Sequence, residues 1–281
     1  MYKTILSILV SFLCLQSYAQ AQLPSAADYK QFYNTKTLVV IEGSPLSGYN
    51  FKIKELIKKN WHLTDYAFIS YDEFKKKKSD PNYSFLITST VTFNKDKTNA
   101  RYHFLSLLLG GPAKDLASMT DLCSIPLSYL NIDEDRYLYK MGSLIHFVQN
   151  HVGLVVQHPE IISKNVLKYY NKNNVKIKGK TLYLLQEELQ KNANSIAKIR
   201  KVYPGKVKFV SEDEIEEAIA SKNKDVVFLH KVGPEQTKHK ARCFKVLIGA
   251  GDGKFYYFDY HMVKKKQTDH FLLSDFRRIA N

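Results

Sequence analysis

Residues 68–74 read Phe-Ile-Ser-Tyr-Asp-Glu-Phe, and residues 209–215 read Phe-Val-Ser-Glu-Asp-Glu-Ile, at an offset of 141 residues. Both stretches place Ser three positions before Glu at the end of a short apolar run, a pattern that predicts a capping box at the start of a helix. At this offset, residues 68–110 and 209–251 share ten of 43 residues without a gap. The identical pairs are Phe68/Phe209, Ser70/Ser211, Asp72/Asp213, Glu73/Glu214, Asn82/Asn223, Val91/Val232, Lys97/Lys238, Ala100/Ala241, Arg101/Arg242 and Gly110/Gly251. The chain is therefore predicted to contain a duplicated unit.

Each copy of the unit reads as a strand, a helix, a second strand, a capped helix, several strands and a closing helix. The fold class predicted is α/β with mixed sheets, formed by a first repeat over 22–158, a helical linker over 159–179 and a second repeat over 180–281. The expected helices include 51–61, 194–203 and a long segment over 133–156. The expected strands are 37–41, 66–70, 84–88, 101–109, 180–184, 207–211, 225–229, 242–248 and 255–260. In the last strand, Phe255, Tyr257 and Asp259 should face one side and Tyr256, Phe258 and Tyr260 the other.

The first 21 residues have the features of a secretory signal peptide. Lys3 precedes an apolar run over residues 5–15, and small residues within 17–21 provide a cleavage site. The run is shorter than the roughly 20 apolar residues of a transmembrane helix, and no later run reaches that length. Cys14 raises the alternative of a lipoprotein, but Leu13 stands where lipid attachment sites carry a small residue. We expect an exported protein, periplasmic or extracellular, without a transmembrane span after signal removal.

The chain is strongly basic, with 42 Lys and Arg against 27 Asp and Glu and a formal net charge of +15. Loss of Lys3 with the signal peptide leaves 41 basic residues and a net charge of +14. Such a charge attracts polyanions over long range, so the expected partners are an envelope protein or an anionic envelope polymer. The lysine runs 75–78 and 264–266 lack interleaved aromatic residues. This pattern is typical of a solvated surface and does not indicate specific nucleic-acid recognition.

Cysteines, histidines and glycines give no sign of a metal or cofactor. Cys123 and Cys243 lie at non-equivalent positions of the two repeats; a disulfide is possible in an exported protein, but the apolar run around Cys243 favours a buried thiol. The nine histidines show no metal-site spacing. The glycine-rich stretch 249–254 is followed by Phe255 instead of the Ser or Thr of a phosphate loop, so it is read as a hairpin turn.

The loop 43–48, Gly-Ser-Pro-Leu-Ser-Gly, is one candidate binding site. It follows the first strand and precedes a helix, at the end of the strand where open α/β sheets tend to bind ligands. It also differs from its counterpart in the second repeat, residues 186–193. The candidate residues are Ser44, Ser47 and Tyr49. The alternative is a Pro/Gly turn with no role beyond the fold.

Arg101 and Arg242 are the second candidate site. Each follows an Ala at the start of a predicted strand, at equivalent positions of the two repeats. Because Arg binds carboxylate and phosphate through two parallel hydrogen bonds, the pair is a candidate for a pseudo-symmetric anion site. The alternative is an internal ion pair in each repeat, with Asp72 and Asp213 as the acidic partners.

The element order over about 36–90 and 180–230, in an exported protein, resembles the TolB-type N-terminal domain and the curli-secretion lipoprotein family. The signal ending and the lysine-rich composition are also similar to those of uncharacterised secreted proteins of gram-negative bacteria. The resemblance implies a non-enzymatic envelope role through protein–protein contact. The duplication and the missing lipid-attachment motif depart from those families, so no residue role or specific partner is carried over.

These observations together predict an exported, non-enzymatic binding or adaptor protein of the cell envelope. One alternative is a hydrolase of an envelope substrate with its site between the repeats, although no paired acid and base or nucleophile motif supports it. Another is a structural subunit of a larger envelope assembly. The sequence leaves the ligand and the oligomeric state open.

Overall fold

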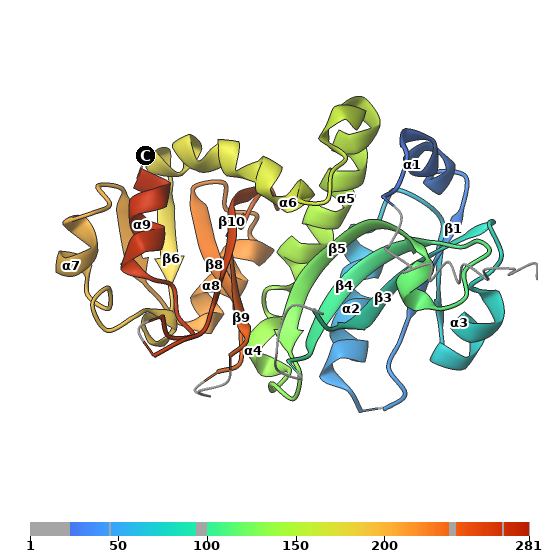
Figure 1. Ribbon diagram of the computed structural model, residues 1–281, viewed down its shortest axis with the longest axis horizontal. Helices are drawn as coiled ribbons and strands as arrows, with labels where there is room; N and C mark the ends of the chain where they lie inside the picture. The colour runs from blue at the N-terminus through green and yellow to red at the C-terminus, as the bar shows by residue number, and fades with distance from the viewer. Residues whose placement is uncertain (1–22, 45, 94–99, 236–239, 266, 281) are drawn as a thin grey trace, which may run out of the picture.

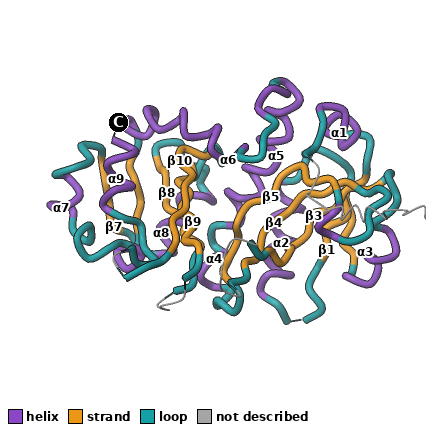
Figure 2. Tube along the Cα trace, viewed as in Figure 1, coloured by secondary structure: helices purple, strands orange, loops and turns teal. Residues whose placement is uncertain are grey.

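The computed structural model describes residues 23–44, 46–93, 100–235, 240–265 and 267–280 (Figure 1). Within these residues, two mixed five-stranded sheets lie side by side along the long axis of the molecule, and helices pack around and between them (Figure 2). This confirms the predicted α/β class built from two similar units. The predicted signal peptide lies outside the described residues.

The first repeat forms sheet A, in which the strands have the order β2-β1-β3-β4-β5. Strands β1 to β3 are parallel and β4 is antiparallel to both of its neighbours. The elements are α1 (Ala26–Phe32), β1 (Lys36–Val40), α2 (Gly48–Asn60), β2 (Tyr66–Ile69), α3 (Tyr71–Lys77), β3 (Tyr83–Val91), β4 (Tyr102–Leu109), a 3₁₀ turn η1 (Leu116–Ser118), β5 (Thr120–Tyr129), α4 (Asp135–Leu138) and α5 (Met141–Gln157).

The second repeat forms sheet B with the same connectivity, in the order β10-β9-β8-β6-β7. Again the first three strands are parallel and the fourth, β9, is antiparallel to its neighbours. The elements are β6 (Thr181–Leu184), a 3₁₀ turn η4 (Gln186–Glu188), α7 (Ile196–Arg200), β7 (Lys206–Phe209), α8 (Glu212–Ala220), β8 (Val226–Val232), β9 (Arg242–Gly249), β10 (Phe255–Met262) and α9 (Leu273–Ala280).

Both predicted capping boxes are present. The Ser70 hydroxyl accepts the Glu73 N–H at 3.2 Å, and the Glu73 carboxylate accepts the Ser70 N–H at 2.8 Å. Ser211 and Glu214 repeat the arrangement at 3.2 and 2.9 Å. The recurring Ser and Glu thus serve to start α3 and α8, and this use satisfies backbone groups that a helix terminus leaves unpaired.

Several elements differ from the sequence-based expectation. The helix expected over 133–156 is divided into α4 and α5, and between them the Lys140 side chain turns inward, where its Nζ lies 3.4 Å from a carboxylate oxygen of Glu188. Helix α7 covers only the middle of the expected 194–203. Helix α1 and strand β5 were not predicted. Phe255 and Phe258 were predicted to face opposite sides of the last strand. The register of β10 shifts between Phe255 and Tyr257, and Phe255 therefore packs in the same hydrophobic core as Phe258.

The segment 159–179 packs on the second repeat. It contains a 3₁₀ turn η2 (Pro159–Ile161), helix α6 (Val166–Tyr169) and a 3₁₀ segment η3 (Tyr170–Gly179). Asn171 both donates to the Phe258 carbonyl and accepts its N–H, at 3.0 and 2.6 Å, and Asn173 donates to the Phe255 carbonyl at 2.8 Å. These amide side chains cover the outer edge of β10 as far as Phe258, where an unpaired strand edge would otherwise be exposed.

The two repeats share one hydrophobic core. Phe147 of α5, in the first repeat, stacks on Phe255 of β10 with ring centroids 3.5 Å apart. Tyr102 of β4 meets Phe244 of β9 edge to face, at 5.3 Å. Apolar contacts of this kind between the repeats fix their relative position, because burying each ring contributes about 2 kcal/mol.

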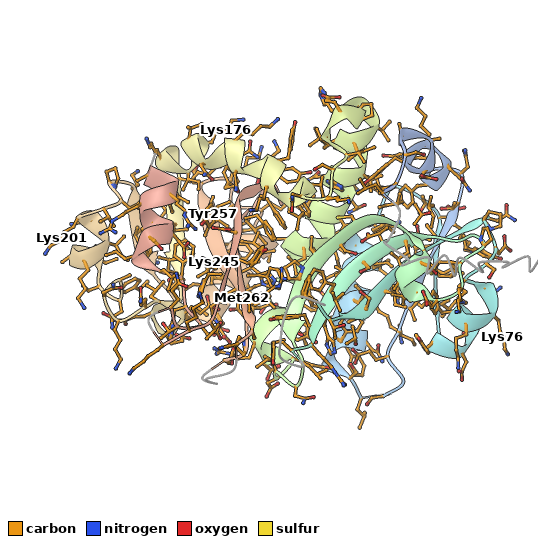
Figure 3. All side chains as sticks on the ribbon, in the orientation of Figure 1. Lys76, Lys176, Lys201, Lys245, Tyr257 and Met262 are labelled. Atoms are coloured by element: carbon orange, nitrogen blue, oxygen red, sulfur yellow. The ribbon has the colours of Figure 1, made fainter. Side chains whose placement is uncertain are left out.

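The surface is rich in lysine on both repeats. Figure 3 shows Lys76 on the first repeat, Lys176 on the segment 159–179 and Lys201 on the second repeat, all at the surface, whereas Lys245 lies inside the second repeat. None of the described helices has the length and apolar character needed to cross a membrane.

A candidate ligand-binding groove between the repeats

A groove of about 330 Å³ is lined by residues of both repeats, among them residues of strands β5 and β10. Each of these strands is the outermost strand of its sheet, so the groove is bordered by one edge of sheet A and one edge of sheet B. Its volume is at the lower end for small-ligand pockets. We call it the junction groove; the residues that matter below are Phe93, Asp121, Ser124, Arg242, Phe258 and Tyr260.

Aromatic rings from both repeats line the junction groove. Phe244 of β9 meets Phe104 of β4 edge to face, with ring centroids 5.8 Å apart, and it lies 5.9 Å from Phe93. Phe258 of β10 stacks on Phe244 at 6.3 Å. These rings give the groove an apolar surface on which a ligand could bury an aromatic or aliphatic group.

Arg242 is held at the border of the groove by two rings and by its own backbone. Its guanidinium carbon lies 4.0 Å from the ring centroid of Phe93 and 4.7 Å from that of Tyr260, close enough for cation–π attraction to both. The Tyr102 hydroxyl accepts the Arg242 N–H at 2.5 Å and donates to the Arg242 carbonyl at 3.1 Å. The positive charge is therefore fixed in place before any ligand binds.

Asp121 is the carboxylate of the junction groove. Its Oδ1 is buried and has no hydrogen-bond partner among the described residues. Burial raises the pKa of Asp121 to about 6, although hydrogen bonds from Ser124 and from the Cys123 backbone oppose this shift. A buried oxygen without a donor is costly in a folded protein, and such groups gather at functional sites.

Replacing Asp121 tests this cost. The folded protein binds the Asp121 proton more tightly than the unfolded chain, so stability falls as pH rises from about 4 to about 6 and stays lower above it. We expect Asp121→Asn, which does not titrate, to raise the free energy of unfolding at neutral pH by about 1–3 kcal/mol. Urea unfolding at neutral pH and at about pH 3.5 measures it. The difference between the proteins should vanish at the lower pH, and an equal difference at both would contradict this account.

The loop with Ser44, Ser47 and Tyr49 is not part of the junction groove. The Ser47 hydroxyl starts α2, and it lies 2.9 and 3.0 Å from carboxylate oxygens of Glu42 and Glu134. Glu134 also accepts the Tyr49 N–H at 3.0 Å. Tyr49 is fully buried, whereas Ser44 is exposed and its carbonyl accepts from the Asn50 amide at 2.9 Å. The structure therefore gives Ser47 and Tyr49 roles in holding the helix start, and a binding role for this loop stays a prediction.

The two predicted arginines occupy different settings. Arg242 borders the junction groove, whereas Arg101 is exposed and is not among the residues that line it. No ion pair within the described part of the chain includes Arg101, and Asp72, its suggested partner, pairs with Lys75 at 2.6 Å. The geometry thus favours Arg242 alone as a site residue. The alignment of the repeats had indicated Arg242. The alternation predicted for the last strand had placed Phe258 and Tyr260 on one face, and both line the junction groove.

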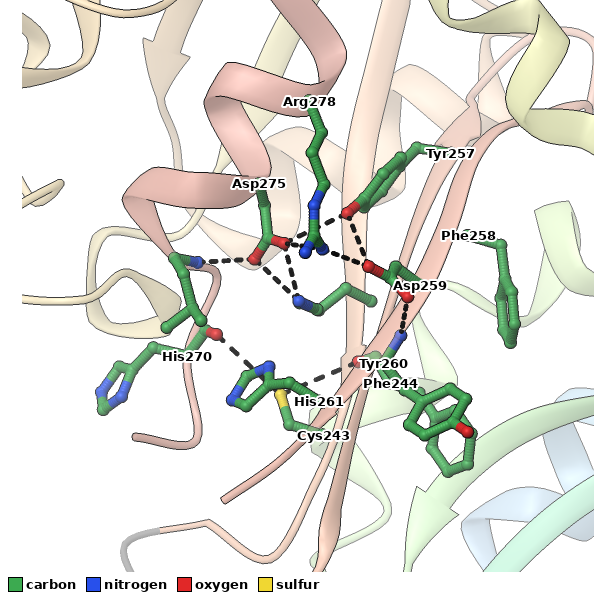
Figure 4. Close-up of polar contacts among 12 residues, drawn as sticks. Cys243, Phe244, Tyr257, Phe258, Asp259, Tyr260, His261, His270, Asp275 and Arg278 are labelled. Carbon is green, nitrogen blue, oxygen red and sulfur yellow. Dashed lines mark hydrogen bonds and ion pairs between the residues drawn. The ribbon is translucent and has the colours of Figure 1, made fainter. Parts of the chain in front are cut away.

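A second polar cluster lies beneath α9. Lys245 of β9 and Asp275 of α9 form an ion pair at 2.7 and 2.8 Å, with both side chains fully buried. Asp275 also accepts the Tyr257 hydroxyl at 3.1 Å, and Arg278 reaches both Asp259 and Asp275 (Figure 4). Every oxygen of Asp275 thus has donors. The cluster holds α9 on sheet B, with Lys245 and Asp275 inside and Arg278 at the surface.

The described residues contain no group of three or more His, Cys, Asp or Glu side chains placed to hold a metal ion. Cys123 and Cys243 are both buried free thiols, and burial raises the pKa of each well above its usual range. Comparison of the chain with models of protein families, with curated proteins and with solved structures found no match.

Proposed function

We propose that this chain is an exported, non-enzymatic binding protein of a bacterial cell envelope and that the junction groove is its ligand site. One observation carries the proposal. Both repeats contribute to a groove in which Arg242 is clamped between Phe93 and Tyr260 above an apolar surface. Export rests on the pattern of residues 1–21.

The composition of the groove supports recognition. Ligand sites are mostly apolar and carry a few polar groups, which here include Arg242, Asp121, Ser124 and, from the segment 159–179, Ser163, Lys164 and Asn165. Among the described lining residues, Asp121 is the one carboxylate and no histidine is present. These groups can orient a ligand, and the net charge of +14 after signal removal, 41 basic against 27 acidic residues, would speed the approach of an acidic one.

Cross-linking in the cells that produce the protein tests this function. Tyr260 is 37% exposed at the border of the groove. We expect a photoreactive benzoylphenylalanine at position 260 to form a discrete adduct with a protein or a glycan upon irradiation. Adding Arg242→Gln should reduce that adduct at least about tenfold, which corresponds to about 1.4 kcal/mol of binding.

The matched control is the same photoreactive residue at Tyr71, which is 51% exposed on α3, away from the groove. It should give no discrete adduct. Equal adducts at positions 71 and 260 would mean that charge alone drives contact with the envelope, and no adduct at 260 would remove the junction groove as the ligand site.

A further inference from the structure

The edge of β5 exposes backbone hydrogen-bonding groups inside the junction groove. The Gly110 N–H donates to the Tyr83 carbonyl at 2.9 Å, so these two residues form a hydrogen-bonded pair between β3 and β4. In an antiparallel ladder every second pair is hydrogen-bonded, and in this register Ser106 and Ile87 form one of those pairs. The backbone of Ser106 therefore points toward Ile87 in β3. Ser124, the partner of Ser106 in β5, must then turn its own N–H and C=O away from β4, toward the groove.

The neighbouring outward groups of β5 confirm this orientation and are already occupied. The Pro126 carbonyl, two residues beyond Ser124, lies 2.9 Å from Nε2 of His230. The Leu122 carbonyl accepts the Tyr29 hydroxyl at 2.6 Å. Between these two covered positions, no described residue forms a hydrogen bond with the outward N–H or C=O of Ser124.

The opposite edge, on β10, is largely occupied in the same place. Asn171 binds both backbone groups of Phe258, so by alternation Tyr260 and Met262 also turn their backbone outward from β10. The Tyr260 N–H is taken by the Asp259 carboxylate at 2.8 Å. Within the groove, side chains thus occupy the outward groups of Phe258 and the Tyr260 N–H on β10, whereas the outward groups of Ser124 on β5 have no partner among the described residues, although open edges are usually blocked.

We propose that the ligand of the junction groove is an extended polypeptide segment that adds as a strand to the edge of β5 at Ser124. This inference rests on the proposed function and names its ligand class. The segment would accept from the Ser124 N–H and donate to the Ser124 C=O, and a further donor would reach the buried Oδ1 of Asp121. Side chains of an added strand alternate, so an apolar one meets the aromatic rings and an acidic one meets Arg242.

The chemistry favours a polypeptide over an anionic polysaccharide. Ser124 offers a donor and an acceptor side by side at strand spacing, and Asp121 requires a donor. A peptide backbone supplies a donor and an acceptor at strand spacing, whereas the sulfate or phosphate groups of an anionic polysaccharide only accept and would repel the Asp121 carboxylate, so that only its hydroxyls could donate there.

Selection of peptides tests the strand addition. A phage-displayed library of random dodecapeptides is enriched on the immobilised mature protein, and the enriched peptides are synthesised with blocked ends. Their dissociation constants are measured by fluorescence anisotropy. We expect Ser124→Pro to weaken binding at least tenfold, because proline has no N–H. Ser124→Ala keeps the backbone N–H and removes only the hydroxyl, so the tenfold loss is measured relative to Ser124→Ala.

The proline variant should fold, because the Ser124 N–H makes no bond within sheet A and Pro126 already occupies an outward position of the same edge strand. If Ser124→Pro does not fold, the peptide is changed instead: single peptide bonds of the enriched peptide are N-methylated, one in each version. At least one N-methyl group should then weaken binding to the wild type tenfold, and a series without effect would overturn the strand addition.

The outcomes separate this inference from the function on which it rests. Peptides that lose affinity with Arg242→Gln but bind Ser124→Pro normally would leave the junction groove as the site and overturn the strand addition. Peptides unaffected by both variants, or no enrichment at all, would overturn the peptide ligand. A wild-type dimer in solution that becomes a monomer with Ser124→Pro would assign the edge to a second copy of the chain and also overturn it.

Discussion

Lys245→Met is expected to lower the free energy of unfolding by about 3–5 kcal/mol, because it removes the buried cation that contacts both oxygens of the Asp275 carboxylate. Lys245 and Asp275 are both fully buried, and each oxygen of Asp275 lies within 2.8 Å of the Lys245 ammonium. Tyr257 and the Leu272 N–H still donate to Asp275 in the variant, and the remaining cation is Arg278, which lies 3.5 Å from one Asp275 oxygen and is 55% exposed. Urea unfolding at neutral pH measures the loss.

Two further variants identify the cause of that loss. Lys76 is exposed on α3, and Lys76→Met should change stability by less than about 0.5 kcal/mol. The double variant Lys245→Met/Asp275→Leu removes both charges, and it should recover at least about half of the loss. A double variant as unstable as Lys245→Met would show that packing, and not the unpaired charge, is responsible.

Gly251→Ala and Gly110→Ala should each lower the free energy of unfolding by about 3 kcal/mol, through overpacking against backbone. A Cβ at Gly251 would lie 2.4 Å from the Lys222 carbonyl oxygen, and one at Gly110 would lie 2.1 Å from that of Asp80. Backbone atoms cannot move aside as the end of a side chain can. The two glycines are a matched pair of the duplication, so the close approach explains why both repeats carry glycine there.

Gly111 provides the control, because a Cβ there would have no atom within 4 Å. Gly111→Ala should stay within about 0.5 kcal/mol of the wild type. Thermal unfolding of the three variants under one set of conditions gives the comparison. Similar stabilities for Gly110→Ala and Gly111→Ala would contradict the role of the close approach.

Local signals in the sequence were sufficient for most of the fold. The capping boxes at Ser70 and Ser211 depend on residues close together in one repeat, and both are present in the structure. The offset of 141 residues paired Gly110 with Gly251, and both glycines lie against backbone of their own repeat. Strand β5 was missed for a physical reason. It contains Pro126 and two irregularities of register, which disturb the alternation that reveals a strand.

The junction groove could not be predicted in the same way. It depends on how two sheets approach each other, through contacts such as Tyr102 with Phe244, which lie far apart in sequence. The repeat alignment did identify Arg242, but it could not show that Arg101 lies outside the groove. Asp121 and Ser124 carry no motif, and their importance comes only from a missing donor and from an outward-facing backbone.

Amide hydrogen exchange tests the central claim most directly. The protein is compared with and without an enriched peptide at saturating concentration, and exchange is followed by mass spectrometry. We expect the segment 120–129 to exchange more slowly in the complex, while residues 42–52 around Ser47 remain unchanged. Protection confined to 42–52 or to the lysine run 75–78, with none in β5, would contradict a ligand site in the junction groove.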